Sequence, residues 1–196
     1  IDIPIIKSNK KYKKLTIIIG SAGENELNIH IKYIKSIIKY SKNINFIYVP
    51  RHLNWKSNFI NNINNSGIDY KFIDNIEFMI EDKINLYIYW GYGLLNNFYS
   101  KSNICLMGNT YNNVGGHNII EPIVNFNHIL IGPIHYTCND IINKMKHINI
   151  CYDEYKLIHK TKNIINNLEN YYYRLVENYN QIIKNKNIIK NNIEKI

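Results

Sequence analysis

The sequence predicts an α/β protein with a Rossmann-like parallel sheet, helices on both faces of the sheet and a helical C-terminal tail. Short apolar runs rich in β-branched residues alternate with longer stretches at helical spacing, as in proteins built on a parallel sheet. Glycine or proline follows most of the apolar runs. From about Tyr155 onward only helical patterns remain.

The first four elements show this alternation. "LTIIIG" (15–20) predicts a buried strand, and "ENELNIHIKYIKSIIKY" (24–40) predicts an amphipathic helix. "INFIYVP" (44–50) predicts the second strand, and "NWKSNFINNINNSG" (54–67) the second helix. Gly67 is placed to end that helix, because glycine readily adopts the left-handed conformation found there.

Six further elements continue the alternation as far as residue 147. In order, they are the strand "INLYIYW", the helix "GLLNNFYSKS", the strand "NICLMG", the helix "HNIIEPIVNF", the strand "HILIGP" and the helix "TCNDIINKMKH". Proline is tolerated in about the first turn of a helix, so Pro122 predicts a helix start between Gly116 and Ile120. "VGGHN" is then the loop that leads into this helix.

Three segments are expected. Residues 1–14 form a linker, residues 15–154 a Rossmann-like domain, and residues 155–196 C-terminal helices. The chain begins with Ile1, which predicts that it is part of a longer protein. The tail carries one apolar stripe, which we expect to dock on the chain's own domain: Leu168, Tyr172, Leu175, Tyr179 and Ile182.

Composition indicates a globular chain with a biased surface. The 196 residues are 45% hydrophobic and 20% charged, with a net charge of +9. Arg51 and Arg174 are the only arginines and Ala22 is the only alanine, whereas Ile, Asn, Lys and Tyr are abundant. Codon bias of an AT-rich genome explains this pattern, so the charge is interpreted as a solvated lysine surface rather than a polyanion groove. No apolar run is long enough to span a membrane, and a soluble fragment is expected.

The metal-binding residue types show no ligand spacing. Cys105, Cys138 and Cys151 form no CxxC pair, and the seven histidines include no HExxH. We therefore expect reduced, buried thiols, no metal site and no cofactor.

Candidate site residues gather where strands end, which is where open α/β sheets bind ligands. These segments are "GSAGENE" (20–26), "PRH" (50–52), "GNTYNNVGGHNIIEP" (108–122) and "GPIHYTCND" (132–140). The composition is biased away from glycine and proline, yet six of the thirteen residues of these types lie between positions 108 and 133. Glycines let the backbone approach a phosphate, and an arginine grips it with two parallel hydrogen bonds.

Each feature also has a simpler interpretation. The Gly115-Gly116 pair fits an ordinary turn, His117 a hydrogen bond at the helix start, and Arg51 a surface position. Glu121 could serve the helix dipole instead of holding a ribose diol. Four functional-looking strand ends on one edge of the sheet favour a nucleotide or sugar-nucleotide site. "GYGLLN" (91–96) lacks the third glycine of GxGxxG and no GxxxxGK occurs, so a dehydrogenase or P-loop enzyme is unsupported.

These motifs, in this order, resemble the C-terminal donor-binding half of 3-deoxy-D-manno-octulosonic acid (Kdo) transferases, which are two-domain GT-B glycosyltransferases. The resemblance covers about residues 2–142 and is most specific at "PRH" and "VGGHNIIEP". It implies that residues 1–14 are a linker from a missing N-terminal domain and that residues 15–154 are the donor-nucleotide domain. It implies inverting, metal-independent transfer of Kdo from CMP-Kdo to a lipid A precursor (lipid IVA) in lipopolysaccharide biosynthesis. The membrane partner and location it implies are the cytoplasmic face of the bacterial inner membrane.

The resemblance also implies roles for residues of this chain. Arg51 would grip the CMP phosphate, Gly115, Gly116 and His117 would wrap the phosphate and sugar, and Glu121 would hold the ribose. The remaining donor-site positions that match are Ser21, Glu24, Glu26, His52 and Asn118. The general base and acceptor pocket belong to the family's N-terminal half, so the catalytic residue is unknown and this chain alone is expected to be incomplete for turnover.

This chain departs from the family at several cleft positions. The family's first loop reads Ser-Thr-His-Glu-Gly-Glu, where this chain has Ser21-Ala22-Gly23-Glu24-Asn25-Glu26. Gly91-Tyr92 stands for an acidic Gly-Glu, Ile88 for an aspartate, and Thr137-Cys138 for Asn-Phe. Two alternatives remain: a GT-B enzyme using a UDP-sugar, and a basic RNA-binding module. Tyrosines concentrated in the C-terminal helix argue against a nucleic-acid partner.

Overall fold

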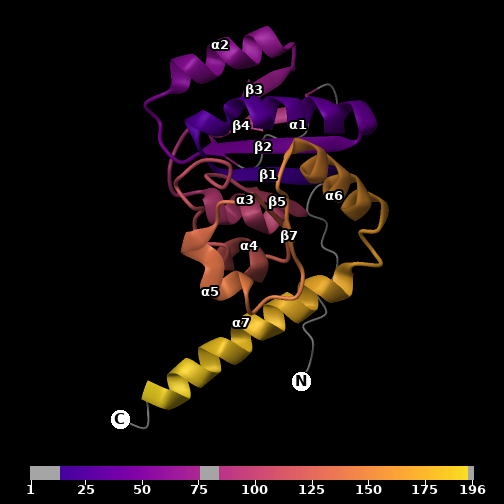
Figure 1. Cartoon of the computed structure of the whole chain (residues 1–196). Helices are drawn as coiled ribbons and strands as arrows, with labels where there is room; N and C mark the ends of the chain where they lie inside the picture. The colour runs from indigo at the N-terminus through magenta and orange to yellow at the C-terminus, as the bar shows by residue number, and fades with distance from the viewer. Residues whose placement is uncertain (1–13, 76–83, 194–196) are drawn as a thin grey trace.

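The computed structural model describes residues 14–75 and 84–193 and contains one parallel sheet (Figure 1). The sheet has seven strands in the order β3-β4-β2-β1-β5-β6-β7. All pairings in it are parallel. The strands are β1 Leu15–Ala22, β2 Ile44–Pro50, β3 Tyr70–Phe72, β4 Leu86–Ile88, β5 Ile104–Met107, β6 His128–Ile131 and β7 Ile148–Ile150. The predicted α/β class and parallel sheet are confirmed.

Helices cover both faces of the sheet. They are α1 Leu27–Tyr40, α2 Lys56–Ser66, α3 Leu95–Lys101, α4 Ile120–Val124, α5 Asn139–Ile142, α6 Glu154–Asn166 and α7 Tyr172–Ile193, with 3₁₀ turns η1 Glu24–Glu26 and η3 Tyr136–Cys138. One core cluster joins α1, α2 and α6 to one face. A second cluster joins α3, α4 and α5 to the other face. Alternate strand residues supply the two clusters, as side chains of a strand point to opposite faces: Ile17 and Ile19 to the first, Ile18 to the second.

The structure tests several sequence predictions about where helices begin and end. Gly67 ends α2 in the left-handed conformation, with φ +70°. Pro122 lies in the first turn of α4, as predicted. That helix is shorter than the expected 117–126, because Phe126 at φ +56° turns the chain away. The expected helix over 137–147 is likewise reduced to η3 and α5.

The sequence analysis did not identify β3 and β7. Both are three-residue strands whose residues are only half-buried, so their apolar signal is weak. The expected linker falls almost wholly outside the described residues. The boundaries of the three expected segments remain a prediction.

The long helix α7 runs diagonally past the sheet and docks on the chain's own domain (Figure 1). Leu175 is buried on it, and the ring of Tyr179 stacks on Phe126, with the ring centroids 4.8 Å apart. Tyr172 is 40% exposed, so the predicted stripe is buried only in part.

Gly108, directly after β5, tests how closely the end of β5 packs against the end of β1. A Cβ there would lie 2.5 Å from the Ser21 carbonyl oxygen and 2.6 Å from the Ala22 Cα, and neither backbone atom can easily move. We expect Gly108→Ala to lower the free energy of unfolding by about 2–3 kcal/mol, measured by urea denaturation.

Gly67→Ala is the matched control. A Cβ at Gly67 meets nothing within 4 Å, and its φ of +70° gives a cost of about 1 kcal/mol. Equal losses for the two variants would contradict the proposed close approach at Gly108.

Candidate functional site

The candidate site lies at the carboxyl end of the sheet, where the topology changes direction. The central strand β1 has β2 on one side and β5 on the other. The loops after β1 and β5 therefore lead away in different directions and leave a crevice between them. Such a switch point is the usual ligand site of an open α/β sheet.

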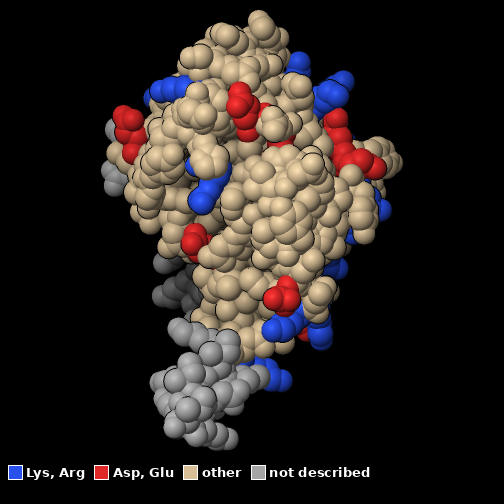
Figure 2. Space-filling model, turned by 60° about the vertical axis from the view of Figure 1, so that its left-hand side comes forward, with Lys and Arg blue, Asp and Glu red and all other residues tan. Residues whose placement is uncertain are grey.

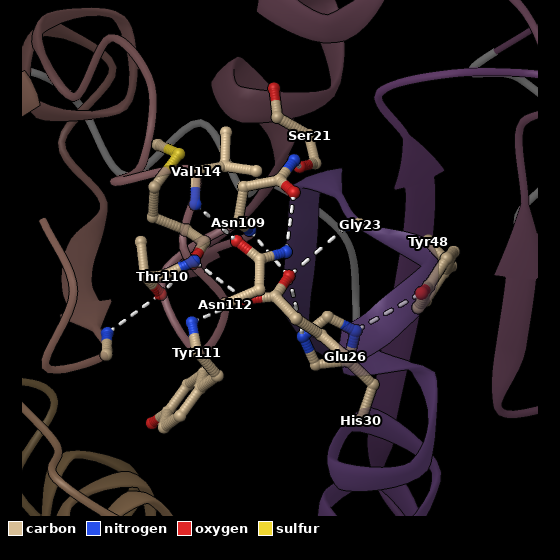
Figure 3. Close-up of polar contacts among 12 residues, drawn as sticks. Ser21, Gly23, Glu26, His30, Tyr48, Asn109, Thr110, Tyr111, Asn112 and Val114 are labelled. Atoms are coloured by element: carbon tan, nitrogen blue, oxygen red, sulfur yellow. Dashed lines mark hydrogen bonds and ion pairs between the residues drawn. The ribbon is translucent and has the colours of Figure 1, made fainter.

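A buried carboxylate joins the two loops (Figure 3). Glu26 Oε2 accepts hydrogen bonds from the backbone N–H groups of Gly23 at 3.3 Å and Asn109 at 2.5 Å. Its Oε1 accepts from the N–H groups of Thr110 at 2.7 Å and Tyr111 at 2.6 Å. Hydrogen bonds to an ionised group are stronger than those between neutral groups. We call this arrangement the Glu26 clamp.

Two aromatic residues lie behind the Glu26 clamp. The Nε2 atom of His30 lies 3.9 Å from Glu26 Oε2, and its Nδ1 lies 3.2 Å from the Tyr48 hydroxyl. Burial lowers the pKa of His30, while the Glu26 charge opposes this effect. Burial, with Glu26, raises the pKa of Tyr48 well above its usual value. The expectation that Glu26 lines the donor cleft is therefore wrong: its side chain has no exposed surface.

Asn109 connects the clamp to the candidate ligand residues. Its Nδ2 donates to the Ser21 carbonyl at 2.8 Å and lies 3.2 Å from His117 Nε2. Both Asn109 (φ +60°) and Ser21 (φ +55°) are left-handed, a conformation that is unfavourable except for glycine and, to a lesser degree, asparagine. Ser21 itself is buried.

His117 and Arg51 lie within electrostatic reach of one another. Burial lowers the pKa of His117, and the nearby Arg51 and His52 add to the effect. When His117 is neutral and its Nε2 accepts from Asn109, its Nδ1 carries the proton. The Arg51 backbone N–H donates to the Ala22 carbonyl at 2.9 Å, which fixes the end of β2 against the loop after β1, and its side chain is exposed.

The Gly115-Gly116 loop is fixed by the residues that replace the family's Asn-Phe. Both glycines have positive φ, +89° and +85°. Thr137 Oγ1 donates to the Gly115 carbonyl at 2.6 Å, and Cys138 Sγ donates to the His117 carbonyl at 2.6 Å. The departure at these two positions therefore holds the glycine loop by hydrogen bonds.

Local hydrogen bonds use part of the hydrogen-bonding capacity of Asn118 and Glu121. Asn118 Oδ1 accepts from the Ile120 N–H at 2.9 Å, which forms an Asx turn just before α4. Its Nδ2 donates to Glu121 Oε1 at 3.4 Å. Neither residue lines the main cleft, so their predicted ligand contacts stay predictions.

A cleft of about 560 Å³ opens beside these groups. Of the predicted site residues, it contains Glu24 and His52. The other residues that line it are Gly23, Asn25, Leu53, Asn54, Trp55, Tyr92, Asn109, Asn112 and Val114. The sequence analysis did not select these as ligand residues, although each lies in a loop that follows β1, β2, β4 or β5; that position was the available signal.

One face of the molecule shows no dedicated polyanion groove. On the face drawn in Figure 2, basic side chains lie in separate groups among acidic ones and do not form a continuous stripe.

Among residues 14–75 and 84–193, no cluster of three His, Cys, Asp or Glu side chains is placed to hold a metal ion. Within the same ranges, every helix is too short or too polar to cross a bilayer.

Comparisons with known proteins agree with the resemblance. The chain is 29% identical over 133 residues to a 3-deoxy-D-manno-octulosonic acid transferase of Aquifex aeolicus, covering 67% of this chain and 35% of that protein. A transferase of the same name from Chlamydia muridarum is 22% identical over 155 residues, covering 77% and 35% of the respective chains. The chain thus spans about a third of the length of these relatives. No family model matches it.

Among solved structures, the chain is similar to the C-terminal CMP-Kdo binding domain of WaaA from Acinetobacter baumannii. The TM-score is 0.79 at 18% identity, covering 88% of this chain and 91% of that one. The fold is that of one half of a GT-B enzyme. The sequence similarity to Kdo transferases and the similarity in fold to this C-terminal domain therefore agree with one another.

Replacing Glu26 by glutamine tests the clamp. The amide nitrogen would face N–H donors and the charge would be lost, so we expect Glu26→Gln to lower the free energy of unfolding by about 3 kcal/mol. Faster amide exchange at Asn109, Thr110 and Tyr111 should accompany the loss. Exposed Glu24→Gln is the control, with a change within about 0.5 kcal/mol. A fully stable Glu26→Gln would show that the clamp is dispensable.

His30 predicts how stability depends on pH. Its pKa in the folded chain lies below the usual 6.5, so the unfolded chain binds more protons between the two values. Stability from this residue is present above pH 6.5 and is lost as pH falls through the folded pKa. Urea denaturation from pH 7 to 5.5 should show a smaller fall for His30→Gln than for the parent chain. Identical profiles would contradict this account, because His117 contributes equally to both.

Proposed function

We propose that this chain is the donor-binding part of a Kdo transferase and binds CMP-Kdo at the switch-point cleft. The observation that supports this proposal most is the Glu26 clamp, which holds the loops after β1 and β5 beside Arg51 and His117. The family's Gly115 to Asn118 and Glu121 motif follows on the same edge of the sheet. The sequence relationship to Kdo transferases supports the choice of donor.

Each candidate residue has a role within this proposal. Arg51 supplies an exposed guanidinium for the donor phosphate, because its fork matches two phosphate oxygens. Gly115 and Gly116 are buried, and their positive φ angles shape the loop that presents His117. Neutral His117 offers its Nδ1–H as a donor. Glu121 accepts from the ribose hydroxyls, and Glu24 and His52 line the cleft. Glu26 positions the loops and does not touch the donor.

The reaction supported by the family relationship is inverting transfer of Kdo to a lipid A precursor, without a metal ion. The acceptor pocket and the general base belong to a second domain, so turnover requires both parts. We place the reaction at the cytoplasmic face of the inner membrane, within lipopolysaccharide biosynthesis. The second domain is also the part proposed to meet the membrane.

Calorimetric titration of the chain with CMP, and with UMP as control, tests the donor assignment. We expect binding of CMP with a Kd on the order of 100 µM and weaker binding of UMP. Arg51→Ala should weaken CMP binding at least about tenfold, since it removes charge-assisted bonds to the phosphate. Arg174→Ala, which removes the same charge from α7, is the matched control and should bind as the parent chain does.

Two outcomes would count against the proposal. If the folded chain gives no heat with CMP at millimolar concentration, the donor site is wrong. Preference for UMP would instead support a glycosyltransferase that uses a UDP-sugar.

A further inference from the structure

The cleft has an apolar wall that none of the assigned roles uses. Tyr92 is 68% exposed and Val114 is 47% exposed, and both line the cleft. Trp55 also lines the cleft but is only 5% exposed, so it forms part of the packed floor of the cleft. Apolar side chains that stay open to solvent in a cleft also lined by asparagines indicate contact with an apolar or aromatic part of a ligand.

The Tyr92 backbone is fixed while its ring stays available. The Tyr89 hydroxyl donates to the Tyr92 carbonyl at 2.7 Å, and Gly93 continues the turn at φ +91°. Within the described ranges, none of the ring-stacking contacts includes Tyr92. An aromatic ring loses little conformational entropy on binding, so a Tyr presented in this way is suited to stacking.

The surroundings of Tyr92 suit the edge of a planar heterocycle. Asn54 and Asn112 line the same cleft, and their amides can both donate and accept hydrogen bonds. Asn112 Nδ2 donates to Asn109 Oδ1 at 2.9 Å, which ties this amide to the Glu26 clamp. The base is the planar π system of a sugar nucleotide, whereas phosphate and Kdo are polar and charged.

We propose that the Tyr92 ring stacks on the pyrimidine base of the donor nucleotide, in place of the acidic residue of the family. This inference rests on the proposed function and extends it to a residue that positions the base. Arg51 and His117 hold the phosphate end, and Tyr92 holds the base end.

The test separates the two ends of the nucleotide. The 196-residue chain is titrated with CMP, cytidine and ribose 5-phosphate, by calorimetry and by tryptophan fluorescence, since Trp55 lines the cleft. Because Tyr92→Ala removes the stacking of one base, we expect it to weaken the binding of CMP and of cytidine about tenfold. Ribose 5-phosphate should bind within about twofold of the parent value. Tyr92→Phe keeps the ring and should bind CMP within about twofold.

Tyr155→Ala is the matched control, because Tyr155 is 77% exposed and lies on α6, outside the cleft. It should leave all three affinities unchanged. CMP binding by Tyr92→Ala equal to that of the parent, or an equal loss for ribose 5-phosphate, would overturn the stacking role alone. Failure of the parent chain to bind CMP would overturn both the donor assignment and the stacking role.

Discussion

The buried carboxylate of Glu26 is the constraint on which the rest of the site depends. It accepts four backbone hydrogen bonds from two loops that leave the central strands in different directions. Each hydrogen bond to a charged group contributes roughly 1.5–3 kcal/mol, and a buried carboxylate without them would be strongly unfavourable. The clamp therefore fixes the loop after β5, including the left-handed Asn109 that contacts His117.

Close approach of the strand ends is the second condition for this geometry. Gly108 lies against Ser21, and Gly132 lies against the Thr110 backbone. The loop after β5 is therefore packed against the loop after β1 on one side and the loop after β6 on the other. Thr110 Oγ1 accepts from the Gly132 N–H at 2.8 Å, and Thr137 holds Gly115. Substitutions away from the family pattern at Thr137 and Cys138 are thus consistent with an ordered glycine loop.

The sequence predicted the parallel sheet because each major strand is an apolar run that ends in glycine or proline. It also predicted a candidate site at the strand ends. It could not separate ligand-facing from structural acids: Glu24 and Glu26 lie two residues apart, and only their burial distinguishes them. Tyr92 and Asn109 were missed for a related reason, since a chain rich in tyrosine and asparagine gives these residue types little contrast. The short edge strands β3 and β7 lacked enough buried residues to be recognised.

The most direct test of the account is to map CMP contacts on the isotope-labelled chain by amide chemical-shift perturbation. We expect the shifts to concentrate at Glu24 and Asn25, at Arg51 to Asn54, at Tyr92 and from Asn109 to His117. Amides of α7 near Glu177 and Lys184, which line a separate basic hollow, should not move. Shifts centred on that hollow, or spread along the lysine surface, would contradict a donor site at the switch point.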